Sequence, residues 1–157
     1  MKRLALIFFA IALLVSCSSE LANTAISQDE KIDSFIESKY ADATVVFNKG
    51  VNRILLEPGD STAFAATGDR VSFSYVGYSF SGTSIGSAFS FGDYISTLGS
   101  GDMIKGLEYG IEGMCPGERS YIIFSCKYSY NKIVAGVGSD QPLVFEVLLN
   151  EINPDNE

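Results

Sequence analysis

Hydrophobic and polar positions alternate along the second half of the chain in the way that β-strands require. In the stretch VSFSY, Val71, Phe73 and Tyr75 fall on one face and the two serines between them on the other. The stretch YIIFSCKYSY is expected to form another strand. A third, PLVFEVLLNEI, places four apolar residues on one face: Leu143, Phe145, Val147 and Leu149. This part of the chain is therefore predicted to be rich in β-structure.

Two shorter strands are expected earlier in the chain. TVVF and VNRILLE flank the turn residues Asn48, Lys49 and Gly50, which is the pattern of a hairpin. Later, SFSGTSIGSAFSFGDYISTLGSG is rich in Ser and Gly yet contains several aromatic residues. Flexible linkers seldom contain so many aromatic residues, so this segment is expected to be strand, bulge and loop over a core.

Two helices are predicted from apolar spacing. Ser27 precedes Glu30 by three residues, a capping-box pattern, and apolar residues then recur at helical spacing, which indicates a helix over 28–40. In LGSGDMIKGLEYGIEGMCPGE, residues 98–118, Asp102 is placed to cap a second helix. The apolar stripe of this helix comprises Ile104, Leu107, Ile111 and Met114.

Three glycines lie beside the stripe of the second helix, at positions 106, 110 and 113. Each costs a helix roughly 0.8–1 kcal/mol relative to alanine. Their missing side chains would let a neighbouring sheet approach closely. Taken alone, the glycines are equally compatible with a weak, bent helix of no functional meaning.

The first residues, MKRLALIFFAIALLVSCSSE, have the pattern of a secretory signal. Two basic residues precede an apolar run from Leu4 to Val15, which is shorter than the roughly 18 residues of a membrane span. The sequence Leu14-Val15-Ser16-Cys17 resembles the lipobox of bacterial lipoproteins, in which the cysteine is lipidated and becomes the mature N-terminus. The alternative is an ordinary signal peptide with an incidental cysteine.

This N-terminal pattern predicts how the chain is organised and where it is located. We expect a signal peptide at 1–16, a lipidated tether at 17–27, a helix and strand extension at 28–56, and one further domain at 57–153. Several acyl chains on Cys17 would anchor the protein stably to a membrane that it does not span. The expected location is the bacterial cell envelope, on the outer membrane and facing either the periplasm or the outside.

Charge and composition exclude several classes of function. Removal of residues 1–16 would leave nine basic residues against 19 acidic ones, and such a surface repels nucleic acid. Histidine is absent, which removes the commonest general base and the commonest metal ligand, so neither a metal nor a Ser/His or Cys/His hydrolase is expected. An extended strand between Cys115 and Cys126 would hold them roughly 30 Å apart, so we expect two separate buried thiols.

Three segments taken together resemble the FKBP family of peptidyl-prolyl isomerases. They are GDRVSFSYVGY, LGSGDMIKGLEYGIEGMCPGER and PLVFEVLLNEI, in the family's order and at nearly its spacing. The resemblance covers roughly residues 57–153. It implies an α+β fold in which a twisted antiparallel sheet wraps around one short helix, with the substrate pocket between them.

The resemblance also implies roles for individual residues. Tyr75, the backbone N–H of Ile104 and the hydroxyl of Tyr130 would form the catalytic group, the last two as donors to the substrate or ligand. Residues expected to line the pocket are Ile85, Tyr94, Met103, Leu107, Val137 and Phe145. Taken one at a time, Tyr75, Leu107 and Phe145 would be buried as plain core in any such fold, and base rates favour that alternative for each. Only Tyr130, with its polar tip beside a loop, favours a functional role.

The sequence departs from the family pattern at the pocket wall and floor. Ile85-Gly86 stands where the family has Phe-Asp, so an aromatic wall and the pocket carboxylate are both missing. Leu107 takes the place of the usual tryptophan, and the segment after Tyr130 lacks the family's Pro-rich stretch.

Isomerisation of an X-Pro bond needs no nucleophile, metal or cofactor. The barrier of roughly 18–20 kcal/mol comes from amide resonance, and an apolar pocket that binds the twisted amide more tightly lowers it. Two functions are expected: a lipid-anchored isomerase that assists folding of exported proteins, or a non-catalytic binding or chaperone lipoprotein. The partners would be proline-containing peptides or unfolded exported proteins, and the membrane through Cys17.

Overall fold

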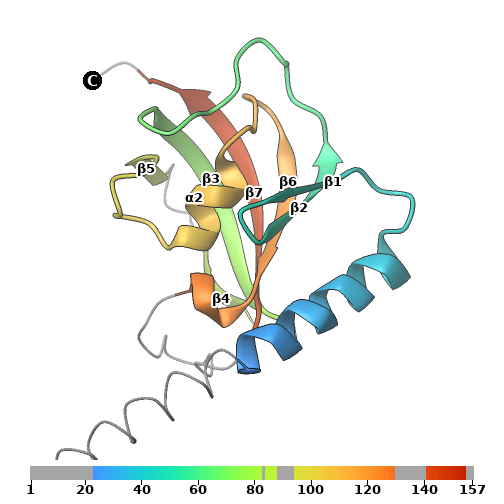
Figure 1. Cartoon of the computed structure of the whole chain (residues 1–157). Coiled ribbons are helices and arrows are strands. Elements are labelled where there is room, and N and C mark those ends of the chain that lie inside the picture. Colours follow the sequence, from blue (N-terminus) through green and yellow to red (C-terminus); the bar gives the residue numbers. More distant parts are fainter. Residues whose placement is uncertain (1–22, 83, 88–93, 130–140, 155–157) are drawn as a thin grey trace, which may run out of the picture.

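The computed structural model describes residues 23–82, 84–87, 94–129 and 141–154, with the backbone alone for 84–87. Within these residues seven strands form one antiparallel sheet in the order β1-β2-β6-β7-β3-β4, and β5 also pairs with β3 (Figure 1). The strands are β1 (Val45–Asn48), β2 (Val51–Glu57), β3 (Arg70–Ser79), β4 (Ser84–Ser87), β5 (Tyr94–Thr97), β6 (Arg119–Phe124) and β7 (Leu143–Ile152). The expected α+β architecture, with its N-terminal extension of helix and strand, is confirmed.

The hairpin predicted around Asn48-Lys49-Gly50 is present as β1 and β2. Asn48 pairs with Val51, which leaves Lys49 and Gly50 as the two turn residues. Both have left-handed backbones, with φ of 51° and 89°. Such turns match the twist of antiparallel strands, which explains why a glycine stands at one of the two positions.

Helix α2 (Lys105–Ile111) packs on one face of the sheet and completes the main core. Figure 1 shows it lying across the central strands. The predicted faces of β3 and β7 are confirmed, since both sets of alternating apolar residues point into this core. The expected cap is wrong: Ile104 occupies the N-cap position without a side-chain bond, and Asp102 instead accepts a hydrogen bond from the Ser100 hydroxyl.

A second apolar cluster covers the opposite face of the sheet, under the N-terminal helix. Ile32 of that helix is fully buried with Ile54 of β2 and Ile123 of β6. Because successive strand residues face opposite sides, β6 contributes Ile122 and Phe124 to the main core and Ile123 to this second cluster. The sheet is therefore covered on both faces.

The N-terminal helix is longer at its start than the sequence indicated. It spans residues 23–39 of the described chain, so residues 23–27, expected in the tether, are already helical. Ser27 lies inside the helix and does not cap it, and Ala25 is buried. The proposed divisions of the chain after residues 16, 27 and 56 otherwise stay predictions.

The stretch YIIFSCKYSY is only partly strand. β6 ends at Phe124, and a 3-10 turn, η1 (Cys126–Tyr128), follows. The N–H of Tyr128 donates to the carbonyl of Ser125, and that of Ser129 to Cys126, which closes the turn. The turn removes these residues from the β-ladder, and an alternating pattern alone does not reveal it.

Cys115 and Cys126 are separate, buried thiols, as predicted. Among the described residues, no helix has the length and apolar character needed to cross a membrane.

Candidate active site

Aromatic side chains from four strands meet on the face of the sheet that α2 covers. Tyr75 of β3 lies 6.1 Å from Tyr94 of β5 and 5.9 Å from Phe145 of β7, measured between ring centroids. Phe73 joins them at 5.3 Å from Tyr94, and Phe124 stacks on Phe145 at 5.7 Å. The structure thus brings together the three described aromatic residues that the resemblance assigned to the pocket.

Phe73 and Phe124 complete this aromatic group and were not assigned to it from the sequence. Phe73 was recognised only as a member of the same strand face as Tyr75. Phe124 follows Ile122 by two residues on β6, so strand alternation places both on one face, and that signal could have found it.

The helix contributes the aliphatic side of the site. Met103, Ile104 and Leu107 are 7%, 5% and 5% exposed and belong to the same core as Phe145. Ile104 is extended at the N-cap of α2, and its carbonyl accepts from the N–H groups of Leu107 and Glu108. Because Ile104 stands at the start of the helix, its own N–H has no helical carbonyl one turn earlier to which it could donate. This is the geometry that would leave that N–H available to a substrate carbonyl.

The loop before α2 is held by a side chain of the helix itself. Glu108 Oε1 accepts hydrogen bonds from the N–H groups of Gly99, at 3.2 Å, and Gly101, at 3.1 Å. Both glycines have positive φ, so the backbone can turn its amides toward one carboxylate. Glu108 therefore fixes the segment that leads to Met103 and Ile104.

Several predicted site residues fall outside what the structure describes. Cys17, Tyr130 and Val137 are not among the described residues, and of Ile85 only the backbone is described, within β4. Their assigned roles stay predictions.

At its C-terminal end, α2 contacts a buried ion pair that was not predicted from the sequence. Arg53 of β2 is 9% exposed and donates to the carbonyls of Gly110, Glu112 and Gly113, at 3.1–3.3 Å. Its Nε lies 3.4 Å from Oε1 of Glu118, which is 6% exposed. The cation thus neutralises the negative end of the helix and satisfies carbonyls that have no partner within it. The sequence did offer a signal for this ion pair, because Arg53 stands among the apolar residues of the predicted strand VNRILLE.

Glu112 joins three segments at the same end of the helix. Its carboxylate accepts from Lys49 Nζ at 2.6 Å, from Asn48 Nδ2 at 3.1 Å and from the Thr67 hydroxyl at 3.1 Å. The hydrogen bond from Lys49, followed by that from Asn48, lowers the pKa of Glu112 despite partial burial. The same bond raises the pKa of Lys49.

The chemistry that the described residues can support is apolar enclosure with backbone donors. No cluster of three potential metal ligands occurs among them. A hollow of about 320 Å³ lies on the opposite face of the sheet, lined by Phe35 of the N-terminal helix, by Tyr40 just after this helix and by Tyr121 of β6. It contains none of the residues that the resemblance assigns to catalysis, so we place the candidate site at Tyr75 and Ile104.

Comparison with known proteins places the chain in a family. A search of curated proteins finds no match. A family model for FKBP-type peptidyl-prolyl cis-trans isomerases matches residues 61–150, a range that contains the aromatic group and all of α2. Because this match spans more than half of the sequence, the chain belongs to the FKBP-type peptidyl-prolyl cis-trans isomerase family.

Proposed function

We propose that this protein catalyses cis-trans isomerisation of X-Pro bonds at the site formed by Tyr75, Ile104 and Phe145. The observation that supports the proposal is the joint placement of an aromatic group and the extended Ile104 backbone at the start of α2. An X-Pro amide loses polarity as it twists, so a water-poor aromatic enclosure favours the twisted form over the planar one. A donor at Ile104 N–H would hold the neighbouring carbonyl of the substrate in place.

Exchange spectroscopy by NMR on residues 18–157 with a Phe-Pro peptide tests this proposal. Faster cis-trans exchange than in the free peptide is expected, and it should decrease in Leu107→Ala and in Tyr130→Phe. Lys31→Met, on the exposed side of the N-terminal helix, serves as the matched control. If the peptide keeps its uncatalysed exchange rate when the protein concentration is raised tenfold, the catalytic proposal is refuted.

A second candidate function is peptide binding without catalysis, as in a chaperone module. Ile85-Gly86 favours it, because the aromatic wall and carboxylate expected of the family are absent from that position. In this case the peptide would shift resonances of Tyr75 and Phe145 without any change in its own exchange rate.

We further propose that lipid on Cys17 anchors the protein in the bacterial cell envelope, where it would act on unfolded exported proteins. The support is the placement of Leu14-Val15-Ser16-Cys17 directly after a short apolar run. Mass spectrometry of the purified protein should find an N-terminal acylated cysteine, and Cys17→Ser should release the protein from the membrane fraction. An unmodified N-terminus at another residue would refute the anchor.

A further inference from the structure

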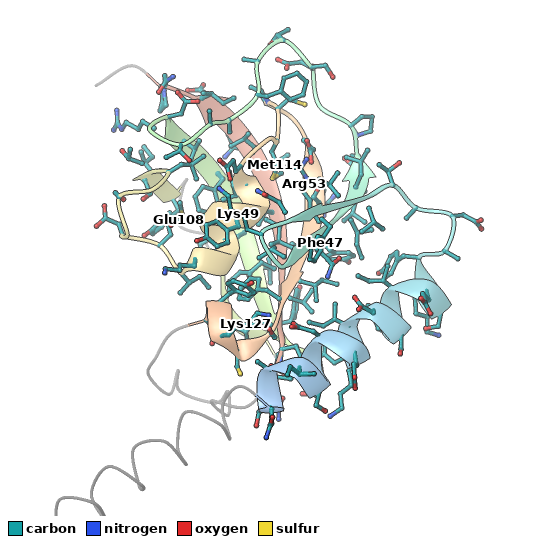
Figure 2. All side chains as sticks on the ribbon, viewed as in Figure 1. Phe47, Lys49, Arg53, Glu108, Met114 and Lys127 are labelled. Carbon is teal, nitrogen blue, oxygen red and sulfur yellow. The ribbon has the colours of Figure 1, made fainter. Side chains whose placement is uncertain are left out.

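The N-terminal helix makes a buried polar contact with a distant turn. Gln28 is 2% exposed although it is polar, and its Oε1 accepts a hydrogen bond of 2.7 Å from the N–H of Cys126. Beside it, Asp29 Oδ2 lies 2.7 Å from Lys127 Nζ. Buried glutamines are uncommon, and here the side chain satisfies a buried amide at the start of η1. Figure 1 shows the first turn of this helix beside η1, and Figure 2 shows Lys127 on that side.

The hairpin of β1 and β2 contacts the same turn from another side. A Cβ added at Gly50 would lie 2.0 Å from the hydroxyl oxygen of Tyr128, so the turn of the hairpin and this side chain are in direct contact. The Tyr128 ring in turn lies 6.0 Å from that of Tyr109 on α2. Two parts of the N-terminal extension therefore hold η1, and η1 contacts the helix of the candidate site.

The hairpin also holds α2 directly. Asn48 Nδ2 donates to the carbonyl of Tyr109 at 2.9 Å, and Lys49 pairs with Glu112. Figure 2 shows Lys49 and Arg53 directed toward the helix from the hairpin. These contacts come from residues before position 61, outside the range that the family model matches.

We propose that residues 23–57 are a positioning element of the isomerase site, with Gln28 as a positioning residue that fixes η1. The Tyr128 ring of η1 contacts that of Tyr109 on α2, the helix whose N-cap is Ile104 of the proposed site. If the amide of Cys126 loses its acceptor, η1 is no longer held at one position relative to α2. The inference rests on the proposed function, since what is positioned is the isomerase site.

The test compares Gln28→Met, which keeps the volume but removes the acceptor, with Gln28→Glu, which keeps an acceptor oxygen. Lys31→Met on the same helix is the control. All are made in the full-length protein in detergent, and three quantities are measured: amide hydrogen exchange at 126–129, kcat and KM for a Phe-Pro peptide, and the unfolding midpoint. Asp29→Asn provides a milder variant in case Gln28→Met does not fold.

We expect Gln28→Met to speed exchange of the Cys126 amide at least tenfold and to lower kcat/KM severalfold, with Gln28→Glu restoring much of both. Suppose that Gln28→Met folds and that its Cys126 amide exchanges faster, but that its kcat/KM is unchanged. This result would overturn the inference and leave the proposed function intact. If the wild-type protein does not catalyse the exchange, the proposed function is refuted. The Gln28 variants would then be compared by their affinity for the peptide instead of by kcat/KM. A wild type that neither catalyses nor binds the peptide would overturn both.

Discussion

Gly110 of α2 lies against Ile122 of β6 so closely that a Cβ added at the glycine would fall 2.2 Å from Ile122 Cγ2. One turn earlier, a Cβ at Gly106 would lie 2.5 Å from the Phe124 ring. The helix therefore accepts two residues of poor helix propensity because only glycine allows this contact with the sheet. Gly113 differs: it has a φ of 84° just past the helix and needs glycine for its backbone conformation.

Gly110→Ala is expected to destabilise the protein by about 1–3 kcal/mol, because overpacking outweighs the gain of about 0.8–1 kcal/mol in helix propensity. Urea unfolding measures the effect. In an Ile122→Ala background, which removes the atoms that the new methyl would meet, the same change should cost much less. An equal cost in both backgrounds would show that packing against Ile122 is not the reason for the glycine.

Arg53→Met is expected to cost about 3–5 kcal/mol of unfolding free energy, because it leaves Glu118 buried without its cation and removes donors to the end of α2. The double variant Arg53→Met, Glu118→Gln should recover part of that loss. Chemical denaturation of the four proteins of this cycle gives the coupling. Purely additive effects would contradict a direct interaction between the two side chains.

Acid should weaken the junction at Glu112. Its pKa in the folded protein is lowered, chiefly by the hydrogen bond from Lys49, so its contribution to stability is present above the ordinary value of 4.5 and is lost as pH falls through the folded-state pKa. Glu112→Gln should therefore flatten the loss of stability below about pH 4.5. Urea midpoints between pH 7 and pH 3 test this, and Lys49→Met should shift the curve in the same direction.

Tyr94→Ala separates substrate binding from stability. The Tyr94 ring is 37% exposed yet contacts Phe73 and Tyr75, so its loss should raise KM severalfold while costing less than about 1.5 kcal/mol of stability. Leu107→Ala, at a buried position, should instead cost about 2–5 kcal/mol. Peptide titrations and thermal unfolding of both variants make the comparison, and an unchanged KM in Tyr94→Ala would remove this residue from the site.

The thiols of Cys115 and Cys126 should react with a chromogenic disulfide reagent only when the protein unfolds. They are 4% and 6% exposed and are not bonded to each other. Labelling of a Cys17→Ser protein in increasing urea should follow the unfolding transition. Rapid labelling of either thiol under native conditions would contradict its burial.

The sequence by itself determined the strands with strict alternation, the hairpin turn and the apolar stripe of α2. Each is set by local chemistry: side chains alternate along a strand, Lys49-Gly50 suits a left-handed turn, and Ile104, Leu107 and Ile111 share one face of a helix. The family resemblance also predicted that Tyr75, Tyr94 and Phe145 belong to one pocket, and the Tyr75 ring contacts both of the others.

Only the tertiary structure decided the contacts between segments that are distant in sequence. The early start of the N-terminal helix goes with the burial of Ala25 and with the hydrogen bond that Gln28 accepts from Cys126 at η1, which overrode the local capping pattern at Ser27. Arg53 became a helix cap only because pairing of β2 with β6 placed it at the end of α2. Such polar contacts depend on three-dimensional proximity, whereas apolar periodicity is written into the local sequence, and this is why the sequence predicted the core better than the network that holds the site.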